Sequence, residues 1–213
     1  MIFLTDDMDF PPVSYADPEG VLAIGGKLTE SRLIQAYEKG IFPWFEGGSP
    51  VLWWSPDPRM VLFPGEIRIT KSMRQLLRQR RFRVTYNTAF ENVIRSCAEM
   101  KRSGQSGTWI TEEMIEAYCG LYRKGRARSV EVWDGEELVG GLYGVDLGHV
   151  FCGESMFSKV SNASKYGFIT LVKDLEENGY KLIDCQIYTN HLASLGADEI
   201  PRDEFLRILK KEV

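Results

Sequence analysis

The sequence has few of the residues that build metal centres and disulfide frameworks. It contains four cysteines, far apart and without a CxxC pair, and only two histidines. This pattern indicates neither kind of site and is typical of a reducing compartment. It also lacks an apolar run long enough to span a membrane, and the N-terminal MIFLTDDMDF has acidic residues where a signal peptide needs basic ones. We therefore expect a cytoplasmic protein without a membrane partner.

Charge of one sign is not in large excess either. The formal net charge is −4, which argues mildly against a nucleic-acid partner, although binding depends on local charge. With 213 residues and a hydrophobic content of 44%, the chain is long enough to bury a substantial core. We expect one large globular domain with a small appendage.

Residues 1–61 are rich in Pro, Gly and Trp and predict a small, loop-rich N-terminal domain. One convincing helix is predicted there, over residues 30–39, with Thr29 as its N-cap and Gly40 at its end.

Residues 62–213 have the regular patterns of a larger α+β domain. Strands are predicted near residues 62–69 and 82–86, and helices near 71–79, 90–100 and 112–124. Residues 129–157 then hold three strand-like runs separated by turns, which predict an antiparallel meander. A helix ending at Gly179 and a strand in KLIDCQIY follow, and such a crossover usually makes the last strand parallel to the third. The predicted sheet is mixed, mostly antiparallel and flanked by helices.

Polar residues interrupt the last predicted strand. Strict alternation would place Asp184 and Gln186 on one face of the strand. An unpaired carboxylate is costly to bury there. Glu154 on the third strand could face both residues. Two carboxylates and an amide suit the holding or deprotonation of an amine. A buried polar cluster, or an ion pair with a lysine such as Lys165, is the alternative.

An apolar stripe runs along the helix before that strand, where Phe168, Leu171 and Leu175 share one face. Such a stripe is usually core. If the two strands splay apart, however, it would line a pocket for a bulky apolar group, with Leu142, Phe151 and Ile183 as further walls.

Basic residues are concentrated between residues 68 and 83, where no acidic residue occurs. A helix aligns four of them on one face: Lys71, Arg74, Arg78 and Arg81. A basic stripe without counter-charges suits phosphate binding, although a solvated surface face is the alternative. Aromatic residues in or beside Gly/Pro-rich loops could stack a nucleobase, among them Tyr37, Trp44 and Trp109.

Several separated blocks together resemble the bacterial leucyl/phenylalanyl-tRNA protein transferase family, and the match covers nearly the whole chain. The blocks are GIFPWF, WWSPDPR, GTWIT, LVGGLYGV, FCGESMFS, NASK, KLIDCQ and ASLGA-x-EIPR. The resemblance implies transfer of Leu or Phe from leucyl-tRNA or phenylalanyl-tRNA to proteins with an N-terminal Arg or Lys, marking them for degradation. It also implies a small N-terminal domain followed by an acetyltransferase-like (GNAT-like) catalytic domain. We expect a monomer that uses neither metal nor CoA.

By this resemblance Asp184 and Glu154 orient the acceptor amine and could deprotonate it, while Gln186 binds near the ester. The pocket of Leu142, Phe151, Phe168, Leu171, Leu175 and Ile183 would receive the amino acid side chain. Tyr37, Trp44 and Trp109 would hold the 3′-adenosine, and the basic helix would meet the tRNA backbone. Leu142 stands where some relatives have Met, a change that bears on whether Met is also transferred.

Two rival functions fit parts of the sequence. An acyl-CoA-dependent acetyltransferase would need a Gly-rich pyrophosphate loop before the crossover helix, and SMFSKVSNASKYG lacks it. A tRNA-binding protein without catalysis would explain the basic stripe but not the polar strand.

Overall fold

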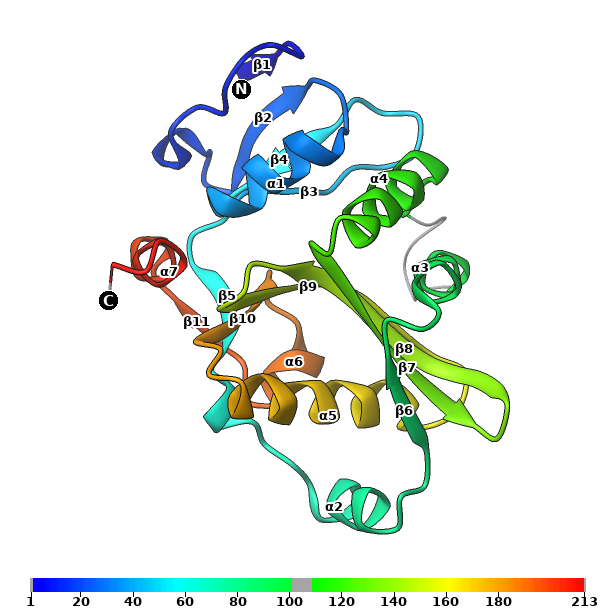
Figure 1. Cartoon of the computed structure of the whole chain (residues 1–213). Coiled ribbons are helices and arrows are strands. Elements are labelled where there is room, and N and C mark those ends of the chain that lie inside the picture. Colours follow the sequence, from blue (N-terminus) through cyan, green and yellow to red (C-terminus); the bar gives the residue numbers. More distant parts are fainter. Residues whose placement is uncertain (1, 101–108, 213) are drawn as a thin grey trace.

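The computed structural model describes residues 2–100 and 109–212. Within them the chain forms a small and a large sheet with helices packed around both (Figure 1). The mixed α+β class predicted from the sequence is confirmed.

The small sheet belongs to the N-terminal part of the chain, and its strands run in the order β1-β2-β4-β3. They span Ile2–Leu4 (β1), Val21–Gly25 (β2), Phe42–Pro43 (β3) and Leu52–Trp54 (β4). A 3-10 turn, Val13–Tyr15, precedes β2. The helix α1, Glu30–Glu38, begins as predicted, since the Thr29 side chain accepts a hydrogen bond from the backbone N–H of Arg32. Gly40 follows its end with φ +75°, a conformation that favours glycine.

The large sheet has the strand order β11-β5-β10-β9-β8-β7-β6. Its strands span Arg59–Leu62 (β5), Arg83–Tyr86 (β6), Ala127–Asp134 (β7), Glu137–Asp146 (β8), Val150–Ser158 (β9), Leu182–Gln186 (β10) and Asp198–Ile200 (β11). The predicted meander is β7-β8-β9. β10 lies beside β9 and parallel to it, as the crossover argument predicted, while the other pairs of this sheet are antiparallel.

Helices cover both faces of the large sheet. They span Lys71–Arg78 (α2), Phe90–Glu99 (α3), Glu112–Arg123 (α4), Ala163–Glu177 (α5), Asn190–Ser194 (α6) and Arg202–Leu209 (α7), with a 3-10 turn at Pro64–Glu66. Buried residues of α3 and α4 share a core with the N-terminal sheet, whereas those of α5 form a second core on the opposite face. Neighbouring β8 residues divide between them: Tyr143 joins the first core and Leu142 the second.

The prediction of a strand at residues 62–69 is wrong. The strand there is β5, which begins at Arg59 and stops before Pro64, whose ring nitrogen has no proton to donate to a ladder. β5 pairs with β10 and β11, so residues 59–61 contribute to the large sheet rather than to the small one. The domain boundary predicted after residue 61 falls within this strand.

Two β-bulges interrupt the neighbouring strands β9 and β10. Tyr143 pairs with Ser155 and Gly144 with Gly153, which leaves Glu154 as the extra residue of β9. Asp184 pairs with Val61 and Gln186 with Met60, which leaves Cys185 as the extra residue of β10. A bulge breaks the alternation of side chains between the faces of a sheet, so residues beyond it are re-aimed.

Candidate functional site

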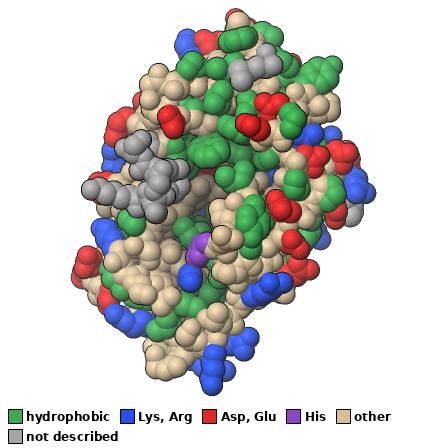
Figure 2. All heavy atoms as spheres, turned by 180° about the vertical axis from the view of Figure 1, so that it is seen from behind, with side chains coloured by type: hydrophobic (Ala, Val, Ile, Leu, Met, Phe, Trp, Pro, Cys, Tyr) green, Lys and Arg blue, Asp and Glu red, His purple; other side chains and the backbone are tan. Residues whose placement is uncertain are grey.

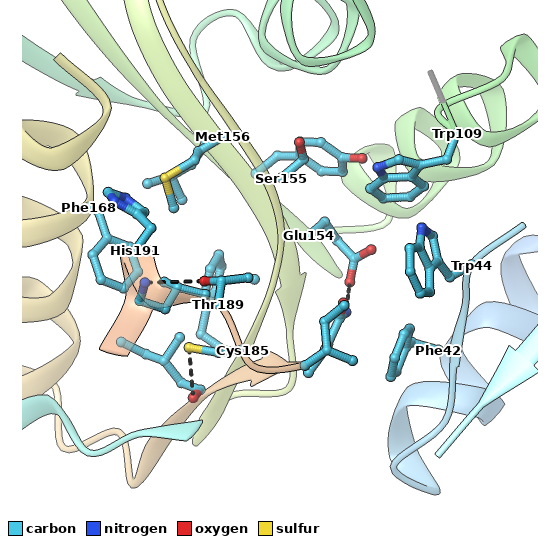
Figure 3. A pocket seen from close by; sticks show the side chains of 18 of the residues that line it. Phe42, Trp44, Trp109, Glu154, Ser155, Met156, Phe168, Cys185, Thr189 and His191 are labelled. Carbon is cyan, nitrogen blue, oxygen red and sulfur yellow. Dashed lines mark hydrogen bonds between the residues drawn. The ribbon is translucent and has the colours of Figure 1, made fainter. Parts of the chain in front are cut away.

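A cavity of about 390 Å³ opens where β9 and β10 diverge. Their parallel ladder ends at the pairing of Asp184 with Cys152, just before both bulges. In Figure 3, Trp44 and Trp109 lie at one side of the cavity, Phe168 and His191 at the other, and Glu154 between them. Figure 2 shows hydrophobic side chains gathered around a hollow on the face opposite to that of Figure 1.

Glu154 is the centre of a hydrogen-bond network at the cavity wall. Its Oε1 accepts from Gln186 Nε2 at 2.7 Å and from the Tyr37 hydroxyl at 2.7 Å. Its Oε2 accepts from the Tyr118 hydroxyl at 2.9 Å. The two bulges explain why Glu154 and Gln186 meet, since each is re-aimed into the space between the diverging strands.

The pKa of Glu154 is raised from its usual value of 4.5 to about 7. Burial is the largest cause, and the negative charge of Asp184 adds to it, while the hydrogen bonds from Tyr37, Tyr118 and Gln186 oppose it. A carboxyl that titrates near neutral pH inside a cavity is suited to exchange protons with a substrate.

Asp184 does not share a face with Gln186, contrary to the alternation assumed for the strand. Its side chain is 1% exposed, does not line the cavity, and forms a bidentate ion pair with Arg59 at 2.8 and 2.7 Å. The residue that meets this carboxylate is therefore Arg59 rather than Lys165. Asp184 Oδ1 also accepts a hydrogen bond from the backbone N–H of Gln186 at 3.0 Å.

That last hydrogen bond stabilises an unusual backbone. Gln186 has φ +67°, a left-handed conformation that a residue with a side chain rarely adopts. The bond from its N–H to Asp184 offsets part of this cost, and the result is an amide side chain directed at Glu154. Asp184 therefore affects the cavity through Gln186.

Arg59 connects Asp184 to two other parts of the fold. Its Nη1 donates to the carbonyl oxygen of Gly40 at 3.2 Å, and its guanidinium lies 4.8 Å from the Phe42 ring and 4.7 Å from the Phe205 ring. Phe42 lines the cavity from the N-terminal sheet. Arg59 thus joins both walls of the cavity and α7, a role that sequence patterns did not reveal.

Four of the six predicted side-chain-pocket residues line the cavity: Leu142, Phe151, Phe168 and Ile183. Leu171 and Leu175 do not; both are fully buried in the core behind the wall. The sequence missed several apolar lining residues, namely Phe42, Met156, Cys185, Ile187 and Leu192. Cys185 has the same strand parity as Ile183, a signal that could have identified it. His191 also lines the cavity, and burial followed by the charge of Lys165 lowers its pKa.

The aromatic residues proposed for nucleobase stacking separate into two groups. Trp44 and Trp109 line the cavity, whereas Tyr37 is 1% exposed and does not. Trp44 is supported by Trp54, whose ring lies 5.3 Å away and whose Nε1 donates to the Trp44 carbonyl oxygen at 2.7 Å.

The basic stripe is shorter than predicted. Lys71, Arg74 and Arg78 lie exposed on α2, while Met73 on its other face is buried. α2 ends at Arg78, and Arg81 beyond it forms a bidentate ion pair with Asp134 at 2.8 and 2.5 Å. Figure 2 shows Lys and Arg side chains gathered at the lower end of the molecule, the end at which Figure 1 places α2.

Residues 2–100 and 109–212 contain neither a cluster of metal ligands nor a membrane-spanning helix. No group of three or more His, Cys, Asp or Glu side chains among these residues could hold a metal ion. None of the helices in the same ranges has the length and apolar character needed to cross a membrane.

Comparisons with known proteins agree over nearly the whole chain. Residues 61–210 match the family model "Leucyl/phenylalanyl-tRNA protein transferase", and residues 26–57 match the model of the N-terminal domain of the same family. A curated leucyl/phenylalanyl-tRNA protein transferase of Flavobacterium johnsoniae is 63% identical, covering 100% of both chains. The one from Flavobacterium psychrophilum is 58% identical over 99% of this chain and 100% of its own.

Two solved structures resemble the fold distantly. L-PGS from Bacillus licheniformis is 14% identical with a TM-score of 0.41, covering 88% of this chain and 63% of that one. A GCN5-related N-acetyltransferase from Kribbella flavida is 10% identical with a TM-score of 0.37, covering 78% of this chain and 59% of that one. The chain spans less than two thirds of either protein, and no conclusion about activity follows from likenesses at this level.

Proposed function

Because the chain belongs to the leucyl/phenylalanyl-tRNA protein transferase family, we propose that it moves leucine or phenylalanine, and methionine less well, from aminoacyl-tRNA to acceptor proteins. The acceptor is the N-terminal arginine or lysine of a protein, the product is a new peptide bond, and the added residue marks that protein for degradation. The reaction takes place in the cytoplasm and is carried out by a monomer.

One observation carries the proposal: a single cavity combines an apolar end with the polar pair of Glu154 and Gln186. The apolar end, walled by Leu142, Phe168 and Met156, suits a leucyl or phenylalanyl side chain. In this proposal the ester and the incoming amine meet at the polar pair. The shape of the pocket disfavours side chains that are branched at Cβ. The discrimination is about 1–3 kcal/mol, the value of one methylene in an apolar pocket.

The chemistry requires positioning rather than activation. An aminoacyl ester is already reactive, so the protein has to hold a neutral amine close to the carbonyl carbon and stabilise the oxyanion. Neither a metal ion nor CoA has a step to perform in this scheme. Gln186 donates a hydrogen bond near the ester, and Glu154 attracts the cationic amine.

Asp184 acts in this scheme as a positioning residue. Its carboxylate is 1% exposed and bound by Arg59, so it is out of reach of an amine in the cavity. Its contribution is to hold the Gln186 backbone in the conformation that directs the amide at Glu154.

The tRNA is bound at two places. Trp44 and Trp109 hold the terminal adenosine at the cavity, because aromatic faces stack nucleobases. Lys71, Arg74 and Arg78 on α2 contact the phosphate backbone. Tyr37 and Arg81, whose polar groups already have partners within the protein, have no part in these contacts.

The test is transfer of label from radiolabelled phenylalanyl-tRNA to a protein with an N-terminal arginine. Label should move to this protein, should not move to the same protein with an N-terminal glutamate, and should be lost after ribonuclease treatment. Transfer of an acetyl group from acetyl-CoA instead would establish the acetyltransferase alternative. Binding of the tRNA without transfer would leave a tRNA-binding protein.

A further inference from the structure

The two carboxyl oxygens of Glu154 and the hydroxyl oxygens of Tyr37 and Tyr118 are joined by three short contacts. The Tyr37 hydroxyl contacts Glu154 Oε1 at 2.7 Å, the Tyr118 hydroxyl contacts Glu154 Oε2 at 2.9 Å, and the two hydroxyls contact each other at 2.5 Å. Each contact requires one proton between its oxygens, because two lone pairs at such a distance repel. Three protons are therefore needed to satisfy the cluster.

The two tyrosines together bring only two protons. If Glu154 is a carboxylate and both hydroxyls donate to it, the contact between Tyr37 and Tyr118 has none. If Glu154 is a carboxylic acid, each of the three contacts has one proton. Burial, followed by the negative charge of Glu154, raises the pKa of both tyrosines well above its usual value, so neither hydroxyl supplies a charged form near neutral pH.

We propose that Glu154, Tyr37 and Tyr118 form one proton-accepting unit, which takes the proton of the acceptor amine by changing from two protons to three. This deepens the proposed transfer reaction and rests on it. Tyr118, which nothing in the sequence singled out, is a positioning residue of this unit, and so is Tyr37, which the sequence assigned to the adenosine.

The protons and bonds balance as follows. The acceptor arrives as an ammonium group with three N–H protons, and the two-proton unit takes the first of them. The nitrogen lone pair then attacks the ester carbonyl carbon, the bond from that carbon to the 3′-oxygen breaks, and the second proton goes to this oxygen. The third remains on the new amide nitrogen, and the unit afterwards releases its own proton to water.

The surroundings of the unit favour this exchange. An N-terminal amine has a pKa of about 7.7–8.0, and that of Glu154 is raised to about 7, so the proton moves between groups of similar affinity. Among residues 2–100 and 109–212, the titratable or charged groups that face the unit are Tyr143 from β8, Cys152 from β9 and Asp184 from β10, the last paired with Arg59 from β5. Although Arg59 pairs with it, the negative charge of Asp184 contributes to the raised pKa of Glu154.

Tyr118→Phe tests the proposal because it removes one hydroxyl and little volume. The variant loses a hydrogen bond to the charged form of Glu154 and also removes the contact between Tyr37 and Tyr118 that lacks a proton in that form. A hydrogen bond to a charged acceptor is the stronger of the two effects, so the Glu154 pKa should rise by about one pH unit. Tyr122→Phe is the matched control: Tyr122 lies on the same helix, and its hydroxyl donates to the Asn87 carbonyl oxygen at 2.7 Å. This control should leave the titration unchanged.

The first measurement follows the Glu154 carboxyl of the free full-length protein by infrared spectroscopy, with Glu154→Gln as the reference. The acid form should be present at pH 6, disappear as the pH rises past about 7, and persist to higher pH in Tyr118→Phe. A carboxylate already ionised at pH 5 would overturn the proposal. Because no substrate is needed, this result does not depend on whether the proposed transfer occurs.

The second measurement is the pH profile of kcat for transfer from a short aminoacyl-adenosine analogue. In Tyr118→Phe the acid limb should move to higher pH by about one unit, giving roughly a tenfold loss below pH 7 and recovery toward the wild-type rate at alkaline pH. A loss by the same factor at every pH would mean that Tyr118 is only structural, and would contradict the proposal.

Discussion

Arg59 and Asp184 form an ion pair in which both side chains are 1% exposed, between residues 125 positions apart in the chain. The pair joins β5 to β10, and through Gly40 and Phe42 it also holds the N-terminal sheet against the cavity. A buried pair of this kind costs desolvation when it forms, but removal of one partner leaves a buried charge without compensation.

Asp184→Asn should lower the free energy of unfolding by about 3–5 kcal/mol, because Arg59 then lacks its counter-charge. The rate of transfer should fall at alkaline pH, where Glu154 is ionised in both proteins, because an amide oxygen holds the Gln186 N–H less well than a carboxylate. The acid limb should move to lower pH, because the negative charge of Asp184 no longer raises the Glu154 pKa. Urea unfolding and a pH profile of kcat measure the two effects.

The double variant Arg59→Met with Asp184→Leu is the matched control for that prediction. It removes both charges, so much of the stability should return. The rate should stay low, because a leucine side chain at position 184 offers the Gln186 N–H no acceptor. A double variant that regains stability and full activity would contradict the positioning role.

Glu154 should make the stability of the protein depend on pH. Its pKa in the folded state is raised from 4.5 to about 7, so the folded state binds this proton more tightly than the unfolded state. The resulting stabilisation is fully present below pH 4.5 and is lost as the pH rises through about 7, a change on the order of 3 kcal/mol. The difference in unfolding free energy between the wild type and Glu154→Gln, measured from pH 4.5 to 8, should show this loss; a constant difference would contradict it.

Replacement of Lys71, Arg74 and Arg78 by Ala should weaken tRNA binding and flatten its salt dependence. Three lost phosphate contacts reduce the slope of log K against log salt by roughly 2–3. Turnover of a short aminoacyl-adenosine analogue should be unchanged. Arg81→Ala serves as the control with little effect on the slope, because Arg81 is paired with Asp134. Equal losses with the tRNA and the analogue would exclude a role for α2 in phosphate binding.

Trp44→Ala should weaken binding of both the tRNA and the analogue, since stacking on one base is worth about 1–3 kcal/mol. Trp44→Phe should retain part of the affinity, because a ring remains to stack. Titration of the free protein with the analogue measures both variants. An unchanged affinity in Trp44→Ala would remove this residue from the adenosine site.

Phe168→Leu should shift the preference toward phenylalanine, because the shorter side chain deepens the apolar end of the cavity. The ratio of kcat/KM for the phenylalanyl substrate to that for the leucyl substrate should rise by a factor that corresponds to about 1–2 kcal/mol. Leu175→Val is the control: it lies behind the wall, so stability should fall while the ratio stays constant. If both variants change the ratio alike, the assignment of the wall is wrong.

Local patterns in the sequence determined the secondary structure from α2 to β10, apart from details at the ends. The cap at Thr29, the amphipathic face of α2, the meander and the parallel return of β10 each depend on residues close in the chain or on the handedness of crossovers. The same patterns found Glu154, Gln186, Trp44 and four apolar residues of the pocket wall. The strands of the small sheet were missed, because runs of two to five residues among Pro and Gly carry little periodicity.

Tertiary structure alone decided which polar groups meet. The bulges at Glu154 and Cys185 break the two-residue period that strand predictions assume, and so separate Asp184 from Gln186 and bring Gln186 to Glu154. Arg59, Tyr37 and Tyr118 reach these groups from distant parts of the chain, and Asp134 reaches Arg81 in the same way. These partners are far apart in the chain and meet only when the elements that carry them pack together. Local sequence patterns therefore cannot predict them.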